Sequence, residues 1–376
     1  MRNLALGALL LLAASPALAA PGNDVDIKAD DGTLLKATYH SPGKPGPAVL
    51  LFHQCNSQRK AWAGVASLLV AKGIHVLTID YRGYGESGGV SQDKWTPAER
   101  TRITAEVWPK DLDRAYDFLV AQAGVDRKKI GAGGASCGVN NAIQLARRHP
   151  EDVIALVLLA GGTDDAGQRF LEASPWIPIL ASGAKDDNRI DEAMRWLLGF
   201  SSNPQNQLKV YDKGGHGTAM FAVHKDLEPA IAAWFQKYLV TRPAKPGGPA
   251  KPGPSAQLAA GLREPGGVAK LRADVKAGKK VGIPPENAVN IMAYGELQAG
   301  RVKEAIELFA LNAEAHPDSA NVWDSLSDAY LAAGDRAKAV EYAKKALEVL
   351  PRDKQADEAT RKAIREAAEA KIRDAK

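Results

Sequence analysis

The stretch Gly134-Ala135-Ser136-Cys137-Gly138 decides the fold of this chain. It fits the pattern G-x-S-x-G, with a strand-like apolar run before it (129–133) and a helical period after it (139–149). A serine at such a strand–turn–helix junction lies on a sharp turn, and the small flanking residues let strand and helix approach closely. The sequence therefore predicts Ser136 as a nucleophile. A cysteine nucleophile does not fit, because the shifted register lacks both glycines.

A serine of this kind needs an acid and a histidine, which follow it along the chain in that order. A strand-like run ends in Gly183-Ala184-Lys185-Asp186, and we predict Asp186 as the acid, with Asp187 as its close neighbour. The other interpretation of Asp186 is a solvated acid in a loop. His216 lies in a glycine-rich loop after the last predicted strand and is the expected general base. Among the other six histidines His53 is the main competitor, but it precedes the serine, and all six are expected to be structural or on the surface.

Short apolar runs alternate with helical periods between residues 24 and 240. Such alternation is typical of a parallel sheet covered by helices, so the expected fold class is α/β, a doubly wound, mostly parallel sheet. Asp31-Gly32 separates two earlier strand-like runs and indicates an antiparallel hairpin at the start. The later apolar runs are 49–52, 75–79, 129–132, 153–159 and 177–180, and the helical periods are 62–72, 112–122, 140–148 and 226–239.

The negative oxygen formed during acyl transfer needs backbone N–H donors, one from the residue after the nucleophile and one from an early strand–helix loop. Cys137 follows Ser136 and supplies the first. The second is expected from the loop His53-Gln54-Cys55, directly after the strand-like run 49–52. We favour Cys55 for this position, with Gln54 as the alternative.

Together these residues resemble the α/β-hydrolase superfamily, in particular its dienelactone-hydrolase-like and serine-aminopeptidase-like branches, which have small or absent lids. Residues 80–87 look like that family's D-x-R-G-x-G-x-S turn. The resemblance covers about residues 24–240 and implies a Ser-His-Asp triad, no cofactor, and hydrolysis of an ester, amide or thioester. It implies a small acyl ester or a peptide-like substrate without separating the two. One departure is Gln54, because the family usually has glycine after the histidine.

The N-terminus indicates export. Residues 1–19 read as a secretory signal, with Arg2, an apolar run from 4 to 14, and the small-residue site Ala17-Leu18-Ala19. We therefore expect a periplasmic or secreted protein with no membrane span.

Cys55 and Cys137 are the only cysteines, and both border the expected oxyanion site. In an oxidising compartment two such thiols tend to pair, so a disulfide is predicted; two small buried thiols are the alternative.

The C-terminal part has a different composition. Residues 241–255 form a Pro/Gly/Lys linker. Residues 286–353 contain a 34-residue period, in which Gly300 recurs as Gly334 and Pro317 as Pro351. This period resembles a pair of tetratricopeptide repeats within an all-α module (256–376), closed by a capping helix over 355–373. Such repeats imply contact with a protein partner or with another copy of the chain.

A net charge of +5 and a pI near 9.0 are typical of proteins that bind nucleic acids. However, the basic excess falls in residues 241–283, which hold nine basic and two acidic residues, and the hydrolase-like part (20–240) is neutral. We therefore expect no nucleic-acid partner.

No metal-ligand spacing or phosphate loop is found in the sequence, so no metal is expected. The expected function is an exported serine hydrolase of the carboxylesterase type; the alternative is a scaffold protein with an inactive hydrolase fold.

Overall fold

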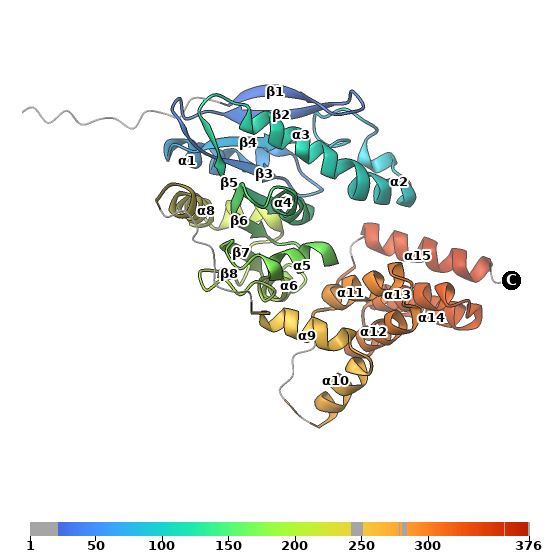
Figure 1. Ribbon diagram of the computed structural model, residues 1–376. Helices are drawn as coiled ribbons and strands as arrows, with labels where there is room; N and C mark the ends of the chain where they lie inside the picture. The colour runs from blue at the N-terminus through green and yellow to red at the C-terminus, as the bar shows by residue number, and fades with distance from the viewer. Residues whose placement is uncertain (1–21, 242–250, 278, 280–283, 357, 375–376) are drawn as a thin grey trace, which may run out of the picture.

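The computed structural model describes residues 22–241, 251–277, 279, 284–356 and 358–374. The expected signal (1–19) and most of the expected linker (241–255) therefore lie outside the described residues. The N-terminal part is built on one sheet in the order β1-β2-β4-β3-β5-β6-β7-β8 (Figure 1). The strands are β1 (Asn23–Lys28), β2 (Leu34–His40), β3 (Gly46–Phe52), β4 (His75–Ile79), β5 (Val125–Ala135), β6 (Val153–Leu159), β7 (Ile179–Ala184) and β8 (Gln207–Tyr211).

The first two strands form the predicted antiparallel hairpin, and the remaining strands from β4 to β8 are parallel. The carboxyl ends of the central strands therefore meet at one edge. Phe52 pairs with Gly134, Ala135 pairs with Leu159, and Ala184 pairs with Tyr211. The loops after β3, β5, β7 and β8, which carry all the predicted site residues, emerge at this edge. Ligands of such sheets bind at the carboxyl ends of the strands. The sheet confirms the expected α/β-hydrolase-like fold class.

Helices cover both faces of the sheet. Buried side chains of α1 (Ala63–Ala71) and α8 (Leu227–Phe235) pack against one face. Those of α3 (Trp108–Val120), α4 (Cys137–Arg148), α5 (Asp165–Ala173) and α6 (Ile190–Leu198) pack against the other. Two further helices are α2 (Pro97–Arg102) and α7 (Met220–Val223). Short 3-10 or π turns occupy Arg59–Trp62, Gln92–Lys94, Ile103–Val107, Gly217–Ala219, Gln236–Thr241 and Leu350–Arg352.

The turn after β4 is structural. Asp80 is fully buried and accepts hydrogen bonds from the backbone and the guanidinium of Arg59, itself buried, and from the amide of Glu86. Gly85 has a φ of +53°, and a Cβ there would lie 2.3 Å from the Asp80 carboxylate. Only glycine fits this backbone, because it has no Cβ. Residues 80–87 thus hold the hairpin β1–β2 and the loop after β3 together.

The C-terminal part is entirely helical in its described residues, and we call it the helical lobe (254–373). Its first segment forms two helices with Gly266 between them, at a φ of +77°. Gly300 and Gly334, with φ values of +76° and +78°, end the first helix of two successive pairs. The helices are α9 (Pro254–Arg263), α10 (Gly267–Lys276), α11 (Glu286–Gln298), α12 (Val302–Ala315), α13 (Ala320–Ala332), α14 (Arg336–Val349) and α15 (Glu358–Arg373).

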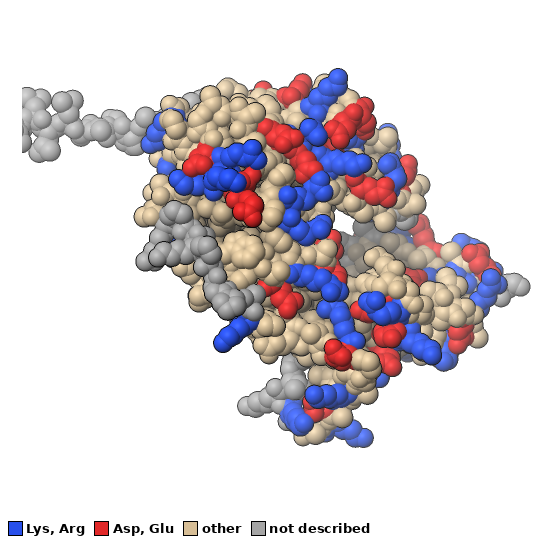
Figure 2. Space-filling model, in the orientation of Figure 1, with Lys and Arg blue, Asp and Glu red and all other residues tan. Residues whose placement is uncertain are grey.

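The helical lobe packs directly on the sheet-bearing part (Figure 1). One cluster of buried hydrophobic residues continues from the sheet through Phe200 into Ala259 and Met292. The Nδ2 of Asn188, after β7, donates to the carbonyl of Gln355 over 3.2 Å. Figure 2 shows the surface hollowed between the two parts. No helix in the part of the chain that the structure describes has the length and hydropathy needed to cross a membrane.

Candidate active site

Ser136 lies on the turn between β5 and α4, as the motif predicts. Its backbone has φ +53° and ψ −119°, a strained conformation for a residue with a side chain. Neighbouring backbone leaves no room for a side chain at Gly134 or Gly138. A Cβ at Gly134 would lie 1.8 Å from the carbonyl oxygen of Gly138, and a Cβ at Gly138 would lie 2.4 Å from that of Phe52. The turn is therefore held between β3 and α4, and it leaves Ser136 half-buried at the sheet edge.

His216 lies in the loop after β8, and a carboxylate holds its ring. Its Nδ1 is 2.6 Å from Oδ2 of Asp187. The Asp187 side chain is 14% exposed and that of His216 is 37% exposed, so the acid is shielded while the imidazole remains accessible. A carboxylate on Nδ1 keeps the proton there and leaves Nε2 free to accept one. Ser136 and His216 border the same cavity.

The predicted choice of Asp186 as the partner of His216 is wrong in this structure. The Asp186 carboxylate accepts the backbone N–H groups of Gly214 and Gly215, at 3.1 and 3.2 Å. The reason is the turn after β7. The amide of Asp187 donates to the carbonyl of Ala184 at 3.3 Å, and the left-handed residues Asn188 and Arg189 follow, so the chain leaves the strand direction at these two acids. Asp186 thus holds the backbone of the histidine loop, while Asp187 reaches the ring.

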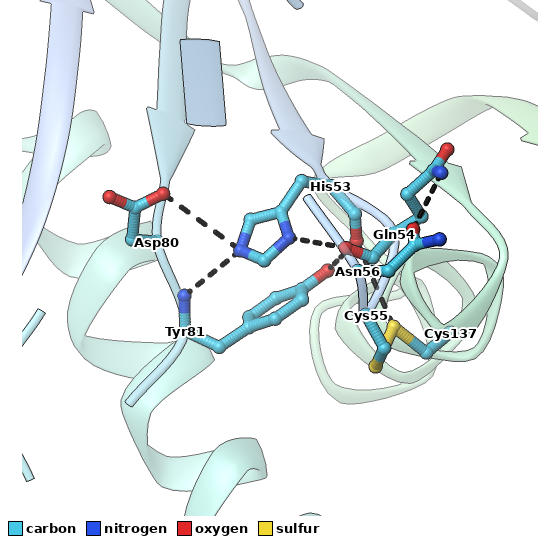
Figure 3. Close-up of a disulfide and its surroundings, with 7 residues drawn as sticks. All are labelled: His53, Gln54, Cys55, Asn56, Asp80, Tyr81 and Cys137. Carbon is cyan, nitrogen blue, oxygen red and sulfur yellow. Dashed lines mark hydrogen bonds and ion pairs between the residues drawn. A yellow bond between two sulfur atoms is a disulfide. The ribbon is translucent and has the colours of Figure 1, made fainter. Parts of the chain in front are cut away.

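The structure joins Cys55 and Cys137 in a disulfide with their Cα atoms 5.8 Å apart (Figure 3). The bond links the loop after β3 to the first turn of α4. Cys137 is the first residue of α4, where backbone N–H groups have no partner within the helix. Among the described residues, no backbone carbonyl accepts from the amide of Cys55. Both amides expected to form the oxyanion hole are therefore next to this covalent link.

Gln54 has a role that sequence reasoning missed. Its side-chain Oε1 accepts from the amide of Thr218 at 2.8 Å and from the Thr218 hydroxyl at 3.0 Å. Its Nε2 donates to Asn56 at 2.7 Å. Thr218 is two residues beyond His216, so Gln54 connects the loop after β3 to the histidine loop. A glycine at this position would offer no such bond, so the glutamine after His53 is the sequence feature from which the role could have been found.

His53, the competing histidine, is fully buried and does not border the cavity. Its Nδ1 donates to the carbonyl of Gln54 at 2.7 Å, and its Nε2 accepts from the amide of Tyr81 at 3.3 Å (Figure 3). These two bonds fix the neutral ring. Burial lowers the pKa of His53 below its usual range, since a charged ring would lose its hydration. His53 therefore supports the loop and is not a second base.

The cavity at Ser136 has a volume of about 670 Å³. This is within the range of about 300–1,000 Å³ of small-molecule sites. In the described residues no group of three or more His, Cys, Asp or Glu side chains could hold a metal ion. One side of the cavity comes from the sheet-bearing part and the other from the helical lobe. The lining residues are Ser136, Cys137, Asn140, Ala160, Gly161, Gly162, Thr163, Asp164, Asp165, Ile190, His216, Asn287, Asn290, Ile291, Tyr294, Gly295 and Gln298.

Comparison with known proteins places the similarity in the sheet-bearing part. Residues 43–181 match the family model of serine aminopeptidase, S33. The match includes Ser136 and ends before Asp187 and His216. An uncharacterised protein of Mycobacterium tuberculosis is 33% identical over 160 residues, which are 42% of this chain and 52% of that protein. A thiohydrolase of Aspergillus aculeatus is 30% identical over 127 residues, 33% of this chain and 37% of that protein.

The chain thus spans about half the length, or less, of these curated relatives. Among solved structures, an esterase of Pyrococcus furiosus superimposes with a TM-score of 0.46 at 17% identity, covering 58% of this chain and 91% of the esterase.

Proposed function

We propose that this protein is a serine hydrolase that cleaves an ester or thioester through an acyl-enzyme, with Ser136 as nucleophile. The observation that carries the proposal is the cavity shared by Ser136, on its strained turn, and His216, whose Nδ1 is held by Asp187. A serine and an imidazole whose Nδ1 is held by a carboxylate, both bordering one cavity, are the groups that acyl transfer requires. The family match over residues 43–181 and the similarity to the Aspergillus aculeatus thiohydrolase support the same class.

In the first step the Ser136 hydroxyl oxygen attacks the substrate carbonyl carbon, and His216 Nε2 takes the hydroxyl proton. The negative oxygen is bound by the amides of Cys137 and Cys55. His216 then returns the proton to the departing alcohol or thiol as the bond to the carbonyl carbon breaks. In the second step water attacks the acyl-serine, with His216 again taking and returning one proton. Asp187 holds the imidazole throughout and replaces Asp186 in the predicted triad.

The assay is hydrolysis of short acyl esters by the wild-type protein and by Ser136→Ala. We expect at least a thousandfold loss of kcat/KM in the variant, of the order seen when a triad serine is removed. Unchanged hydrolysis would refute the assignment. Aminoacyl amides measured beside the esters distinguish a peptidase, which remains the alternative activity. If the wild-type protein cleaves none of them, the inactive scaffold becomes the better account.

We also propose export and a protein-binding role. The pattern of residues 1–19 supports a periplasmic or secreted protein, and sequencing the N-terminus of the mature protein tests this: a chain beginning near residue 20 is expected.

The 34-residue period and the helix pairs α11–α12 and α13–α14 support a tetratricopeptide-like module that binds a partner protein or a second copy. Light scattering across a concentration series tests self-association.

A further inference from the structure

One face of α11 borders the cavity that contains Ser136. Its opposite face, with Val289, Met292 and Ala293, is buried inside the helical lobe. A substrate bonded to Ser136 would therefore lie between the sheet edge and α11. The α11 residues that line the cavity recur at intervals of three and four positions, so they lie on one face of the helix. They are Asn287, Asn290, Ile291, Tyr294, Gly295 and Gln298.

Direct contacts fix α11 against the sheet-bearing part. Arg263 of α9 binds the Asp165 carboxylate at the start of α5, and its Nε lies 3.5 Å from Oε1 of Glu296 in α11. A Cβ on Gly295 would lie 3.9 Å from the Cβ of Asp165. A Cβ on Gly162 would lie 3.7 Å from the Nδ2 of Asn287. The expectation of a small or absent lid holds for the segment between β6 and β7, but the helical lobe covers this side of the site instead.

The two carboxylates in the lining already have partners within the protein. Asp164 accepts the amide of Gly167 at 2.7 Å as the cap of α5. Asp165 pairs with Arg169 at 2.7 Å and with Arg263. Within the described residues, the lining contains neither Lys nor Arg. A substrate carboxylate placed here would lose its hydration and meet no cation, which is costly.

The remaining lining surface is neutral. Tyr294 donates its hydroxyl to Oδ2 of Asp328 at 2.9 Å, so its ring is the part that can contact a ligand. Ile190 and Ile291 add apolar surface from α6 and α11. Asn287 and Gln298, both exposed, contribute amide groups without charge. This combination suits an acyl chain that is apolar or carries uncharged hydrogen-bonding groups.

We propose that α11 of the helical lobe selects the substrate, and that it favours an uncharged acyl group over one ending in a carboxylate. The inference rests on the proposed function, because it takes Ser136 as the nucleophile. It goes beyond that function by naming the substrate class and by giving the C-terminal helices a part in substrate recognition. Ile291 is the central residue on the cavity face of α11.

The test compares two esters that differ only at the end of the acyl chain, p-nitrophenyl hexanoate and the p-nitrophenyl monoester of adipic acid, at neutral pH. Ser136→Ala gives the background for each. The variant Ile291→Lys places a cation on the cavity face of α11. Its matched control is Leu331→Lys, a similar change at an exposed position of α13 that does not border the cavity. Gln298→Arg repeats the test at an exposed position of the same face if Ile291→Lys does not fold.

We expect the wild-type protein to prefer the hexanoate by about 100-fold in kcat/KM, since the adipate carboxylate has no cationic partner. Ile291→Lys should shift the ratio toward the adipate by about tenfold or more, and Leu331→Lys should leave it unchanged. A ratio near one in the wild-type protein, or a ratio that Ile291→Lys and Gln298→Arg do not change, would overturn the inference while Ser136-dependent hydrolysis keeps the proposed function. If neither ester is cleaved in a Ser136-dependent way, both the function and this inference fail.

Discussion

His216 and Asp187 are joined by a 2.6 Å contact between Nδ1 and Oδ2, although they lie 29 residues apart. The neighbouring carboxylate of Asp186 binds the same loop differently, through the amides of Gly214 and Gly215. Two adjacent acids after β7 therefore act on one loop, one on the imidazole and one on the backbone. This division of roles makes the two acids experimentally separable.

Asp187→Asn should lower kcat/KM for a short acyl ester by about a thousandfold or more, because an amide at this position no longer holds the proton on Nδ1 or stabilises the charged ring. Asp186→Asn is the matched control. Gly214 and Gly215 donate to different oxygens of Asp186, so an asparagine keeps only one of the two bonds. We therefore expect a loss of about tenfold or less, in line with one lost hydrogen bond. A larger loss in Asp186→Asn than in Asp187→Asn would reverse the assignment.

Gln54→Ala should reduce kcat while leaving KM nearly unchanged, because it frees the amide and hydroxyl of Thr218 and loosens the loop that carries His216. Loss of one or two hydrogen bonds suggests a decrease of about tenfold to a hundredfold. Asn56→Ala is the control, since it removes only the other partner of the Gln54 amide. Gln54 acts here as a positioning residue. Equal effects of the two variants, or a change in KM alone, would argue against that role.

The disulfide closes a loop with a sequence separation of 82 residues. Replacing both cysteines by serine should lower the free energy of unfolding by about 2–4 kcal/mol, as measured by urea denaturation. The wild-type protein treated with a reductant should approach the stability of the double variant. Titration of denatured, unreduced protein should detect no free thiol. Two free thiols would show that the bond does not form in the isolated protein.

Stability should fall as the pH drops below about 6.5, the ordinary value for histidine. Burial lowers the pKa of His53, and also those of His40, His75 and His316. The unfolded chain therefore binds protons at a higher pH than the folded chain. The stabilising contribution is complete above the unfolded pKa and is lost as the pH falls through the folded one.

Thermal unfolding midpoints between pH 7.5 and 5 measure this loss. In His53→Gln the new side chain still has a donor and an acceptor but does not titrate. The thermal unfolding midpoint of this variant should therefore decrease less with falling pH than that of the wild-type protein. Parallel pH profiles for the two proteins would show that His53 is not responsible.

Local patterns in the sequence predict the central part of the fold. The apolar runs 49–52, 75–79 and 153–159 lie within β3, β4 and β6, since buried parallel strands need continuous apolar residues. The Asp31-Gly32 turn separates β1 and β2 as expected. The helices α2, α5 and α6 were not predicted. The last two are short amphipathic segments of nine residues each, near the lower limit at which a helical period is recognisable.

In the candidate site, too, local sequence patterns predict some residues, whereas others depend on how the chain packs. The pattern G-x-S-x-G and the order of the residues along the chain point to Ser136 and His216, and the structure places both on one cavity. The choice between Asp186 and Asp187 depends on how the turn after β7 packs against the histidine loop, which two identical residue types in sequence do not determine. The contact of α11 with the cavity depends on how two distant parts of the chain pack, and no local pattern encodes that.

The most direct measurement of the central claim is the intact mass of the protein after reaction with a fluorophosphonate, which forms a stable bond to an activated serine. We expect one adduct, located on Ser136, that is absent in Ser136→Ala and forms much more slowly in His216→Gln. An unreactive wild-type protein, or equal labelling of Ser136→Ala, would contradict it.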